Sequence, residues 1–282
     1  MMKVDGLPVS ADHDRIENAP PPEDTPGWFA FARSLVFFLG YALLTLIYGS
    51  LSLLTWVFPH KIRYRIIISW TYLVIYWARL VCGLRFTVIG KENLPASRQG
   101  LIVLSKHQST WETLFLQGFF APSVTVLKKQ LLRIPFFGWG LSALRPIAID
   151  RDKPREALKQ VKGHGCERIA QGFNLILFPE GTRSAPGERG RYARSGAEIS
   201  LACGAPIVPI AVNAGRLWKP GRFSKVSGLI TVSIGPLIYP STPKENEEFD
   251  QAQAPAKSSR SLMQEVEDWI ETEMNRLDSL EK

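Results

Sequence analysis

The chain has 282 residues, of which 45% are hydrophobic and 21% charged, and its net charge is +8. This composition excludes widespread disorder and fits one large domain, or one domain with an anchor. A basic balance suits an anionic partner, whether phosphate head groups, an acidic membrane surface, an acidic carrier protein or nucleic acid. Three scattered cysteines without a CxxC pair argue against a disulfide framework and a zinc site, and predict buried free thiols (Cys82, Cys166 and Cys203).

The first 27 residues differ in character from the rest. They carry six acids and two bases, a net charge of −4, so the remaining residues carry +12. They include the run Ala19–Glu23, which is rich in proline, and they lack the basic n-region of a signal peptide. We predict a disordered polar tail over residues 1–27.

Two apolar segments follow, and we predict membrane-anchoring helices over residues 28–82. Ser34–Phe58 contains 25 residues and no charge, which is long enough to cross a bilayer. Ile66–Val81 is short for a span and holds Arg79, so it reads as an interfacial helix, the return arm of a hairpin, or a buried core helix. A spanning helix and a one-leaflet hairpin both leave the basic body in the cytoplasm by the positive-inside rule. We therefore expect the cell (inner) membrane, with the catalytic domain on its cytoplasmic side.

After the anchor, short apolar runs alternate with helical patterns, which is typical of an α/β domain, here residues 83–241. Several runs are almost wholly apolar, as strands covered on both faces are. We predict strands at Arg85–Ile89, Leu101–Leu104, Ser123–Leu127, Ile147–Ile149, Leu175–Phe178, Ile207–Val212 and Leu229–Ile234. Helical patterns fall between them at Ser109–Phe120, Pro154–Gln171 and Arg194–Cys203. The predicted fold class is α/β, a mixed sheet flanked by helices.

The last segment, residues 242–282, combines a linker with a helix. Thr242–Ser259 is polar and contains proline, as linkers do. Ser261–Leu280 repeats apolar residues at helical spacing with acids between them, so we expect an amphipathic helix that packs on the body.

The first segment with chemical character is Lys106–Glu112. A predicted strand ends just before His107, and the carboxyl ends of strands are where α/β sheets build their sites. A neutral histidine is a natural general base for a hydroxyl, and a carboxylate such as Glu112 can fix its tautomer. Five residues apart, the two side chains need a turn between them to meet. The alternative is structural, because Ser109-x-x-Glu112 also fits a capping box that only starts the helix.

A second segment, Phe178–Ser184, reads Phe-Pro-Glu-Gly-Thr-Arg-Ser directly after a predicted strand. Arg183 offers a planar fork suited to phosphate, and Gly181 permits a close backbone approach. Taken alone, the segment is equally well an ordinary polar turn.

Two further segments carry weaker signals. Lys128–Leu131 places two lysines after a predicted strand, followed by an exposed apolar loop at Pro135–Trp139 and by Ile149-Asp150-Arg151. A solvated basic turn with a core-packing loop is the alternative. Ala205–Val212 is a strand with internal proline, which indicates an edge, a bulge or a special approach of the backbone.

In this order and spacing, the four segments resemble the 1-acylglycerol-3-phosphate acyltransferases (lysophosphatidic acid acyltransferases). The resemblance spans roughly residues 83–235. The family's H-x4-D motif corresponds to His107-x4-Glu112, and its F-P-E-G-T-R-S motif is complete at Phe178–Ser184. Its K-K-E-L, P-F-F-G and I-D-R region is present with Gln130 in place of Glu, and P-I-V-P-I-A stands at Pro206–Ala211. The apolar N-terminus also fits the family's membrane-dipping helices.

Besides Gln130, the chain departs from the family pattern at three places. Glu112 stands for Asp, which moves the carboxylate by about one bond length. Arg145 occupies a position that is often Gly in relatives, and Arg194-Ser195-Gly196 replaces a common Lys-Lys-Gly. Lipid A late acyltransferases also use an H-x4-E pair, but they lack a Phe-Pro-Glu-Gly-Thr-Arg-Ser segment.

The resemblance implies a glycerolipid acyltransferase-like fold and transfer of an acyl chain from acyl-ACP or acyl-CoA to the sn-2 hydroxyl of 1-acylglycerol 3-phosphate, giving phosphatidate. It implies that His107 is the general base and Glu112 its partner. Amide N–H groups at the start of the following helix are expected to stabilise the oxyanion. The expected substrate-binding residues are Arg183 for the phosphate, Lys128 and Arg151 beside it, and Glu180, Gly181 and Thr182 around the glycerol. No metal or other cofactor and no nucleic acid is expected.

Several alternatives stay open from sequence. Alternative acceptors are lyso-ornithine lipid, another lysophospholipid or glycerol 3-phosphate, and a CoA-independent transacylase would use a phospholipid as donor. Ser105 and Ser109 lie near enough in sequence to act as a nucleophile in a ping-pong route. A non-catalytic binding module that keeps the fold is the remaining class.

Overall fold

A computed structural model describes residues 27–96, 99–150, 152–241 and 257–280. The tail expected at residues 1–27 lies outside these ranges, except that Gly27 begins a helix. Arg151 and residues 242–256, which make up most of the expected linker, also lie outside them.

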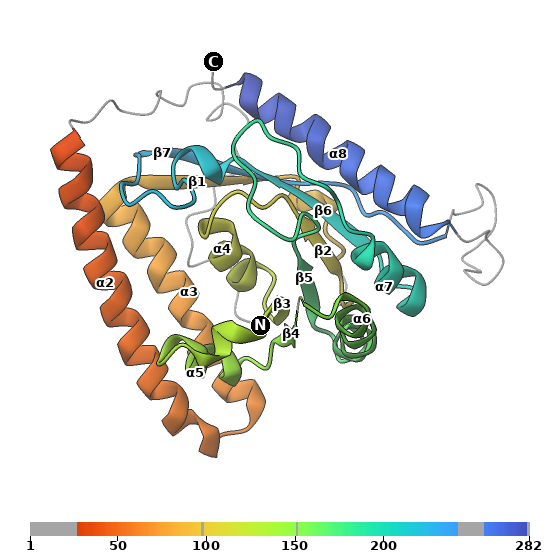
Figure 1. Ribbon diagram of the computed structural model, residues 1–282, viewed down its shortest axis with the longest axis horizontal. Coiled ribbons are helices and arrows are strands. Elements are labelled where there is room, and N and C mark those ends of the chain that lie inside the picture. Colours follow the sequence, from red (N-terminus) through yellow and green to blue (C-terminus); the bar gives the residue numbers. More distant parts are fainter. Residues whose placement is uncertain (1–26, 97–98, 151, 242–256, 281–282) are drawn as a thin grey trace.

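The body is built on a mixed seven-stranded sheet in the order β1-β7-β6-β2-β5-β3-β4 (Figure 1). Its pairs are parallel except β6 with β7, which confirms the predicted mixed α/β sheet. Each predicted strand lies within one residue of an observed one. The strands are β1 Leu84–Ile89, β2 Ile102–Ser105, β3 Ser123–Lys128, β4 Ile147–Ile149, β5 Asn174–Leu177, β6 Ile207–Val212 and β7 Gly228–Ile234.

Helices cover both faces of this sheet, and the central strands alternate between two cores. In β2, Val103 joins the core under α3 and α4, whereas Ile102 and Leu104 join the core under α6, α7 and α8. Both faces are buried, which explains why these strands read as continuous apolar runs. The helices are α2 Gly27–Leu54, α3 His60–Cys82, α4 Trp111–Phe119, α5 Phe137–Ala143, α6 Pro154–Ala170, α7 Ser195–Cys203 and α8 Ser259–Ser279.

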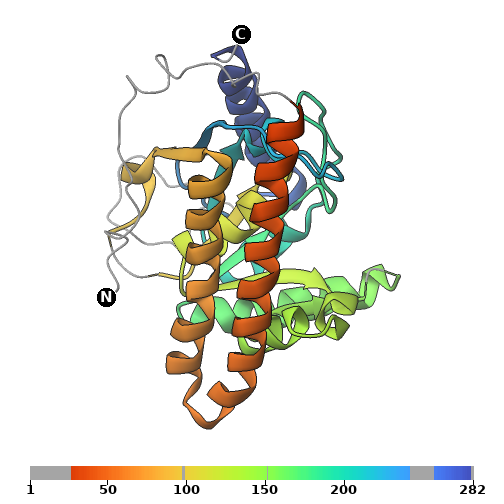
Figure 2. The same ribbon diagram turned by 90° about the vertical axis from the view of Figure 1, so that its left-hand side faces the viewer.

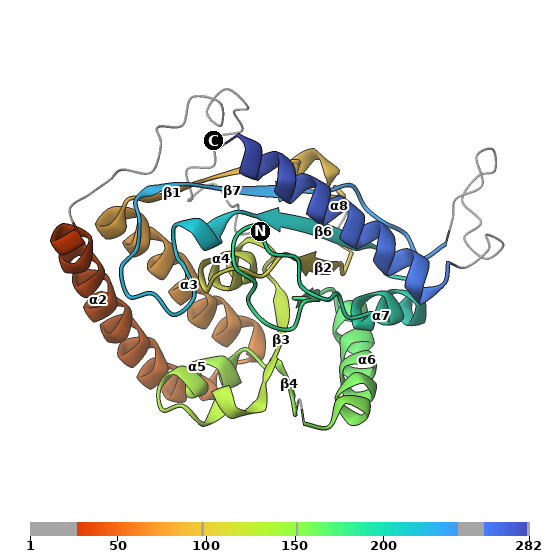
Figure 3. The ribbon, with the colours of Figure 1, turned by 45° about the horizontal axis from the view of Figure 1, so that its top comes forward.

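The C-terminal helix α8 lies across the body over β6 (Figure 3). Its apolar residues, spaced three or four apart, are buried in the core shared with α6 and α7: Leu262, Met263, Val266, Ile270, Met274 and Leu277. Its amphipathic pattern was therefore a reliable signal for a helix that packs on the body.

Helices α2 and α3 form an antiparallel pair at one side of the body (Figure 2). Each is long and apolar enough to cross a membrane. α2 leaves many large apolar side chains exposed, including Trp28, Leu39 and Leu54. α3 buries more of its surface, because its inner face covers the sheet core through residues such as Val74 and Ala78. Exposed apolar surface of this extent marks a membrane or partner contact.

Both ends of α2 are fixed to the body. Near its start, Ser34 Oγ accepts a hydrogen bond of 2.8 Å from the Lys225 amide, and Phe37 packs edge-on against Trp218. Near its end, Gly49 lies flush against Phe136, where an added Cβ would be 2.6 Å from backbone atoms. The helix is about 42 Å long at 1.5 Å per residue, and the contacts at Ser34 and Gly49 lie about 22 Å apart along it.

The apolar segment Pro135–Trp139, predicted as an exposed loop, is instead a tight turn leading into α5. Phe136 has φ 60° and ψ −57°, and the Phe137 amide donates to the Pro135 carbonyl at 2.7 Å. This is a γ-turn of the rare, strained type. Trp139 and Ile134 remain partly exposed. The turn itself packs against α2 at Gly49, a contact that the apolar sequence of the segment does not reveal.

Two sequence signals outside the site have clear structural causes. Pro209 lies in an interior strand, so the edge alternative is wrong. Three steps separate Ile207 from Ile210, whereas four separate their partners Ile238 and Ile234, so a bulge lies opposite Pro209, in the segment after β7. Arg145, where relatives often have Gly, has φ 54°, in the left-handed region that favours glycine.

The three cysteines are free thiols as expected, although only Cys82 is fully buried.

The contact between α2 and α5 predicts opposite effects for one chemical change. Gly49→Ala adds a methyl group against the backbone of Phe136 and should lower the free energy of unfolding by about 1–3 kcal/mol. Gly140→Ala, in α5 with open space around its Cβ, should raise it by about 0.5–1 kcal/mol. Denaturant unfolding in detergent measures both. Equal changes in the free energy of unfolding for the two substitutions would show that α2 does not pack against this turn.

Candidate active site

Four neighbouring strands carry the predicted site segments at one edge of the sheet. Strand β2 leads to His107, its parallel neighbour β5 leads to Phe178–Ser184, β3 ends at Lys128, and β4 leads to Asp150. Because these strands run parallel, their carboxyl ends meet at the same edge. The topology therefore gathers segments that are far apart in the sequence.

His107 and Glu112 are paired, as predicted. Glu112 Oε1 lies 2.9 Å from His107 Nδ1, and the Glu112 side chain is buried. The turn between them allows this contact, since α4 begins only at Trp111. The imidazole stacks on the Phe178 ring at 4.1 Å between centroids, and its side chain is 14% exposed. With Nδ1 held by the carboxylate, Nε2 is the nitrogen left to act on a substrate.

Glu112 also starts the helix, as the capping-box interpretation of Ser109-x-x-Glu112 predicts. The same Oε1 atom accepts hydrogen bonds from the amides of Gln108 at 2.8 Å and Ser109 at 2.5 Å. The Trp111 amide donates to Ser109 Oγ at 3.1 Å. These three amides are occupied, which argues against the expected use of this helix start as an oxyanion site.

The Phe178–Ser184 segment is bonded to the His107 backbone. Both the amide and the hydroxyl of Ser184 donate to the His107 carbonyl, at 2.9 Å and 3.3 Å. Gly181 has φ 68°, and its amide donates to the Phe178 carbonyl at 3.0 Å, so the turn requires a residue without a Cβ. The segment thus fixes the histidine from the opposite side to Glu112.

The remaining predicted binding residues fall into two groups. Lys128, Thr182 and Arg183 are exposed at the site edge, where they are free to meet a ligand. The Arg183 guanidinium lies within electrostatic range of the Tyr41 hydroxyl on α2. Arg151 lies outside the described residues, and its predicted role stays a prediction.

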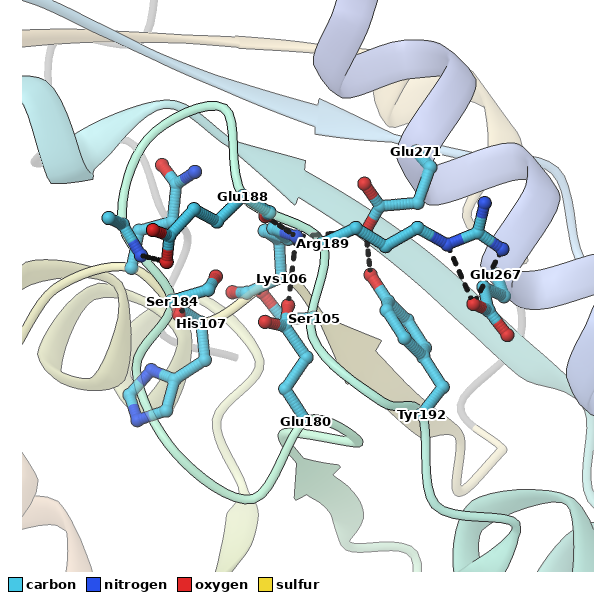
Figure 4. Close-up of polar contacts among 12 residues, drawn as sticks. Ser105, Lys106, His107, Glu180, Ser184, Glu188, Arg189, Tyr192, Glu267 and Glu271 are labelled. Atoms are coloured by element: carbon cyan, nitrogen blue, oxygen red, sulfur yellow. Dashed lines mark hydrogen bonds and ion pairs between the residues drawn. The ribbon is translucent and has the colours of Figure 1, made fainter.

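Glu180, expected beside the glycerol, lies with its carboxylate in a buried ion cluster (Figure 4). Lys106 Nζ lies 3.2 Å from Glu180 Oε1 and donates to Glu271 Oε1 of α8 at 2.8 Å and to the Glu188 carbonyl at 2.9 Å. The Lys106 and Glu180 side chains are each 1% exposed. Tyr192 donates to the same Glu271 oxygen at 2.7 Å, and burial together with this carboxylate raises the pKa of its phenol.

This cluster contains residues that sequence reasoning missed. Lys106 and His107 are adjacent, yet Figure 4 shows their side chains pointing apart, toward α8 and toward the site. The one available signal was a lysine inside an otherwise uncharged strand end, because a buried lysine needs a counter-charge. That its partner is Glu271, 165 positions later, only the fold decides.

A cleft of about 760 Å³ opens beside His107, on the side of α6 and α7. Its floor is formed by apolar residues at the ends of β3, β4 and β5, namely Val126, Ile149 and Leu177, and its wall by Ala157, Leu158 and Val161 of α6. Arg191, Arg194 and Glu198 also line it. This volume is in the range of pockets that bind small molecules and cofactors.

The buried cluster predicts unequal costs for removing two cations that both face α8. Lys106→Met leaves Glu180 and Glu271 buried without their cation and should lower the free energy of unfolding by about 3–5 kcal/mol. Arg189→Ala removes a half-exposed partner of Glu267 and should cost about 1 kcal/mol or less. Denaturant midpoints of the two variants measure the difference. A loss for Lys106→Met no larger than for Arg189→Ala would mean that the cluster does not hold α8.

Comparison with known proteins identifies the family to which this chain belongs. Residues 85–213 match the family model described as Acyltransferase. A 1-acyl-sn-glycerol-3-phosphate acyltransferase from Pseudomonas aeruginosa is 43% identical over 209 residues, which cover 73% of this chain and 80% of that protein. The enzyme of the same name from Saccharomyces cerevisiae is 33% identical over 50% of this chain and 48% of that protein.

A solved structure confirms the architecture. The crystal structure of the 1-acyl-sn-glycerophosphate acyltransferase PlsC from Thermotoga maritima aligns with a TM-score of 0.68 and 23% sequence identity, covering 88% of this chain and 95% of that chain. At this identity the likeness concerns the fold. The sequence matches carry the assignment: the chain belongs to the 1-acyl-sn-glycerol-3-phosphate acyltransferase family.

Proposed function

We propose that this protein transfers a fatty acyl chain from a thioester to the sn-2 hydroxyl of 1-acylglycerol 3-phosphate and forms phosphatidate. The observation that carries the proposal is the His107–Glu112 pair at the edge of a 760 Å³ cleft, bonded to a complete Phe178–Ser184 segment. The P. aeruginosa relative, 43% identical, carries the name of this activity.

His107 acts as the general base. Glu112 keeps the Nδ1 proton in place and stabilises the imidazolium, so Nε2 accepts the proton of the acceptor hydroxyl. The oxygen then attacks the thioester carbonyl, and the tetrahedral species collapses with cleavage of the C–S bond. The imidazolium returns its proton to the leaving thiolate, so no net proton is consumed.

Direct transfer is favoured over an acyl-enzyme. Ser105 is buried and its hydroxyl donates to the Lys106 carbonyl, and Ser109 is buried with its hydroxyl accepting from the Trp111 amide. Neither hydroxyl is bonded to the imidazole, as an activated nucleophile would be.

The acceptor phosphate binds Arg183, with Lys128 and Arg151 as further cations and Gly181 and Thr182 beside the glycerol. Arg183 is exposed, has a planar fork suited to phosphate, and lies within electrostatic range of Tyr41 on α2. Its position next to the apolar helix pair suits an acceptor whose tail stays in the membrane. Glu180 acts through Lys106, by holding the turn that presents these residues. Acyl-ACP or acyl-CoA is the co-substrate, and the reaction needs no metal or redox group.

The two apolar helices associate the protein with a membrane, and we place both in one leaflet. The body contacts α2 near both of its ends, through Ser34 and Gly49, so a spanning α2 would draw the body into the bilayer. Basic residues at the start of α3 favour the cytoplasmic side, although Arg63 is buried and donates to the Ala143 carbonyl.

The catalytic proposal predicts different kinetic defects at two residues. His107→Ala should lower kcat for phosphatidate formation at least ~10²-fold, because it removes the base. Arg183→Ala should raise the KM for lysophosphatidate about 10-fold or more with a smaller change in kcat, because it removes a charge-assisted bond. Steady-state assays of the full chain in detergent micelles measure both.

Arg155→Ala, an exposed arginine of α6, is the matched control and should leave both constants unchanged. Full activity of His107→Ala would refute general-base transfer. Turnover of lyso-ornithine lipid but not of lysophosphatidate by the native chain would refute the acceptor.

The one-leaflet arrangement predicts that the N-terminal tail and the body face the same compartment. In a cysteine-free background, Ser10→Cys and Lys162→Cys should both react with a membrane-impermeant maleimide in inverted inner-membrane vesicles, and neither in intact spheroplasts. Reaction of Ser10→Cys only in spheroplasts would instead show that α2 spans the bilayer.

A further inference from the structure

The cleft beside His107 includes Gly181, which is proposed to lie beside the glycerol, and extends from there along α6 and α7. It lies on the side of α6 and α7, whereas the apolar helix pair α2 and α3 lies at the other side of the body (Figure 1). Arg183, the proposed phosphate ligand of the acceptor, lies within electrostatic range of Tyr41 of α2. Two substrates therefore have separate approaches to one imidazole: a lipid from the helix pair, and a second molecule from the α6–α7 side.

The chemistry of the cleft differs from its floor to its mouth. The floor and the α6 wall are apolar, through residues such as Ile149, Leu158 and Leu177. The mouth holds Arg191 and Arg194, which are both exposed and have no ion-pair partner among the described residues. Glu198 lines the cleft one turn along α7 and is half-buried, and Glu180 is neutralised by Lys106.

We infer that this cleft binds the 4′-phosphopantetheine arm of the thioester donor, with Arg191 and Arg194 on its phosphate and the thioester at His107. The inference rests on the proposed acyltransferase function and deepens it. A pantetheine arm is a narrow chain that joins a phosphate to a thioester, and the cleft joins two arginines to the catalytic base. Arginine forks bind phosphate oxygens in the same way that they bind carboxylates.

The position of the cleft favours the donor over the acceptor here. The donor is water-soluble and reaches the site from solvent, on the side away from the exposed apolar surface of α2 and α3. The acceptor carries a fatty tail that must stay with that apolar surface. The same phosphopantetheine group occurs in coenzyme A and in acyl carrier protein, so one cleft serves both sources.

The test compares three donors with the full-length protein in detergent micelles: acyl-CoA, acyl-ACP and acyl-pantetheine, which has no phosphate. In Arg191→Ala/Arg194→Ala, KM should rise about 10-fold or more for acyl-CoA and acyl-ACP. It should stay unchanged for acyl-pantetheine, and the KM for lysophosphatidate should stay unchanged as well. Arg222→Ala, an exposed arginine on the opposite side of the body, is the control.

Three outcomes would overturn the inference. A higher KM for lysophosphatidate would assign the cleft to the acceptor. An effect on acyl-CoA alone would place the arginines on the nucleotide phosphates and not on the shared phosphate. Unchanged KM for both phosphorylated donors, with active wild-type protein, would refute the cleft while leaving the proposed function intact.

A binding measurement separates the cleft from catalysis. Desulfo-CoA, which has no thiol, should bind wild type and His107→Ala equally by calorimetry, and at least about 10-fold more weakly to the double arginine variant. Equal binding by all three would refute the assignment of the arginines. Arginine-dependent binding by a chain that forms no phosphatidate would support the cleft and refute the proposed reaction.

Discussion

The parallel alignment of β2 with β5 is the constraint on which the site depends. Their register pairs Leu104 with Leu177, so the carboxyl ends of the two strands lie side by side at one edge of the sheet. His107 then stands beside Phe178, which stacks on its ring, and Ser184 reaches the His107 carbonyl. A parallel pair needs a long crossover, which is why the two segments are distant in sequence.

Glu112 and Lys106 fix the catalytic turn from two sides. Glu112 Oε1 accepts from the imidazole and from two amides, so one carboxylate oxygen sets both the helix start and the histidine tautomer. Lys106 ties the other side of the turn to Glu180 and to Glu271 of α8. The C-terminal helix is therefore connected to the active site through buried charges, whose separation would leave uncompensated ions in an apolar interior.

The placement of α2 links membrane association to catalysis. Its outer face is apolar and exposed, while its inner face contacts Trp218 near one end and Phe136 near the other. In the proposed one-leaflet arrangement, a helix held in this way would bring the Arg183 edge of the site to the level of the lipid. The cleft on the α6–α7 side would then stay open to water.

The sequence by itself determined the strands, the helices and the pairing of His107 with Glu112, because apolar periodicity and local motifs encode them. Each predicted strand matched within one residue, and the His107–Glu112 pair needed only a turn of the chain. The tertiary structure alone decided that Glu180 faces Lys106 and not open solvent, and that Pro135–Trp139 presses on α2. It also revealed that the helix-start amides are occupied and that two arginines frame a cleft beside the base. These features depend on contacts between segments that are remote in the chain, and such contacts leave no local pattern to read.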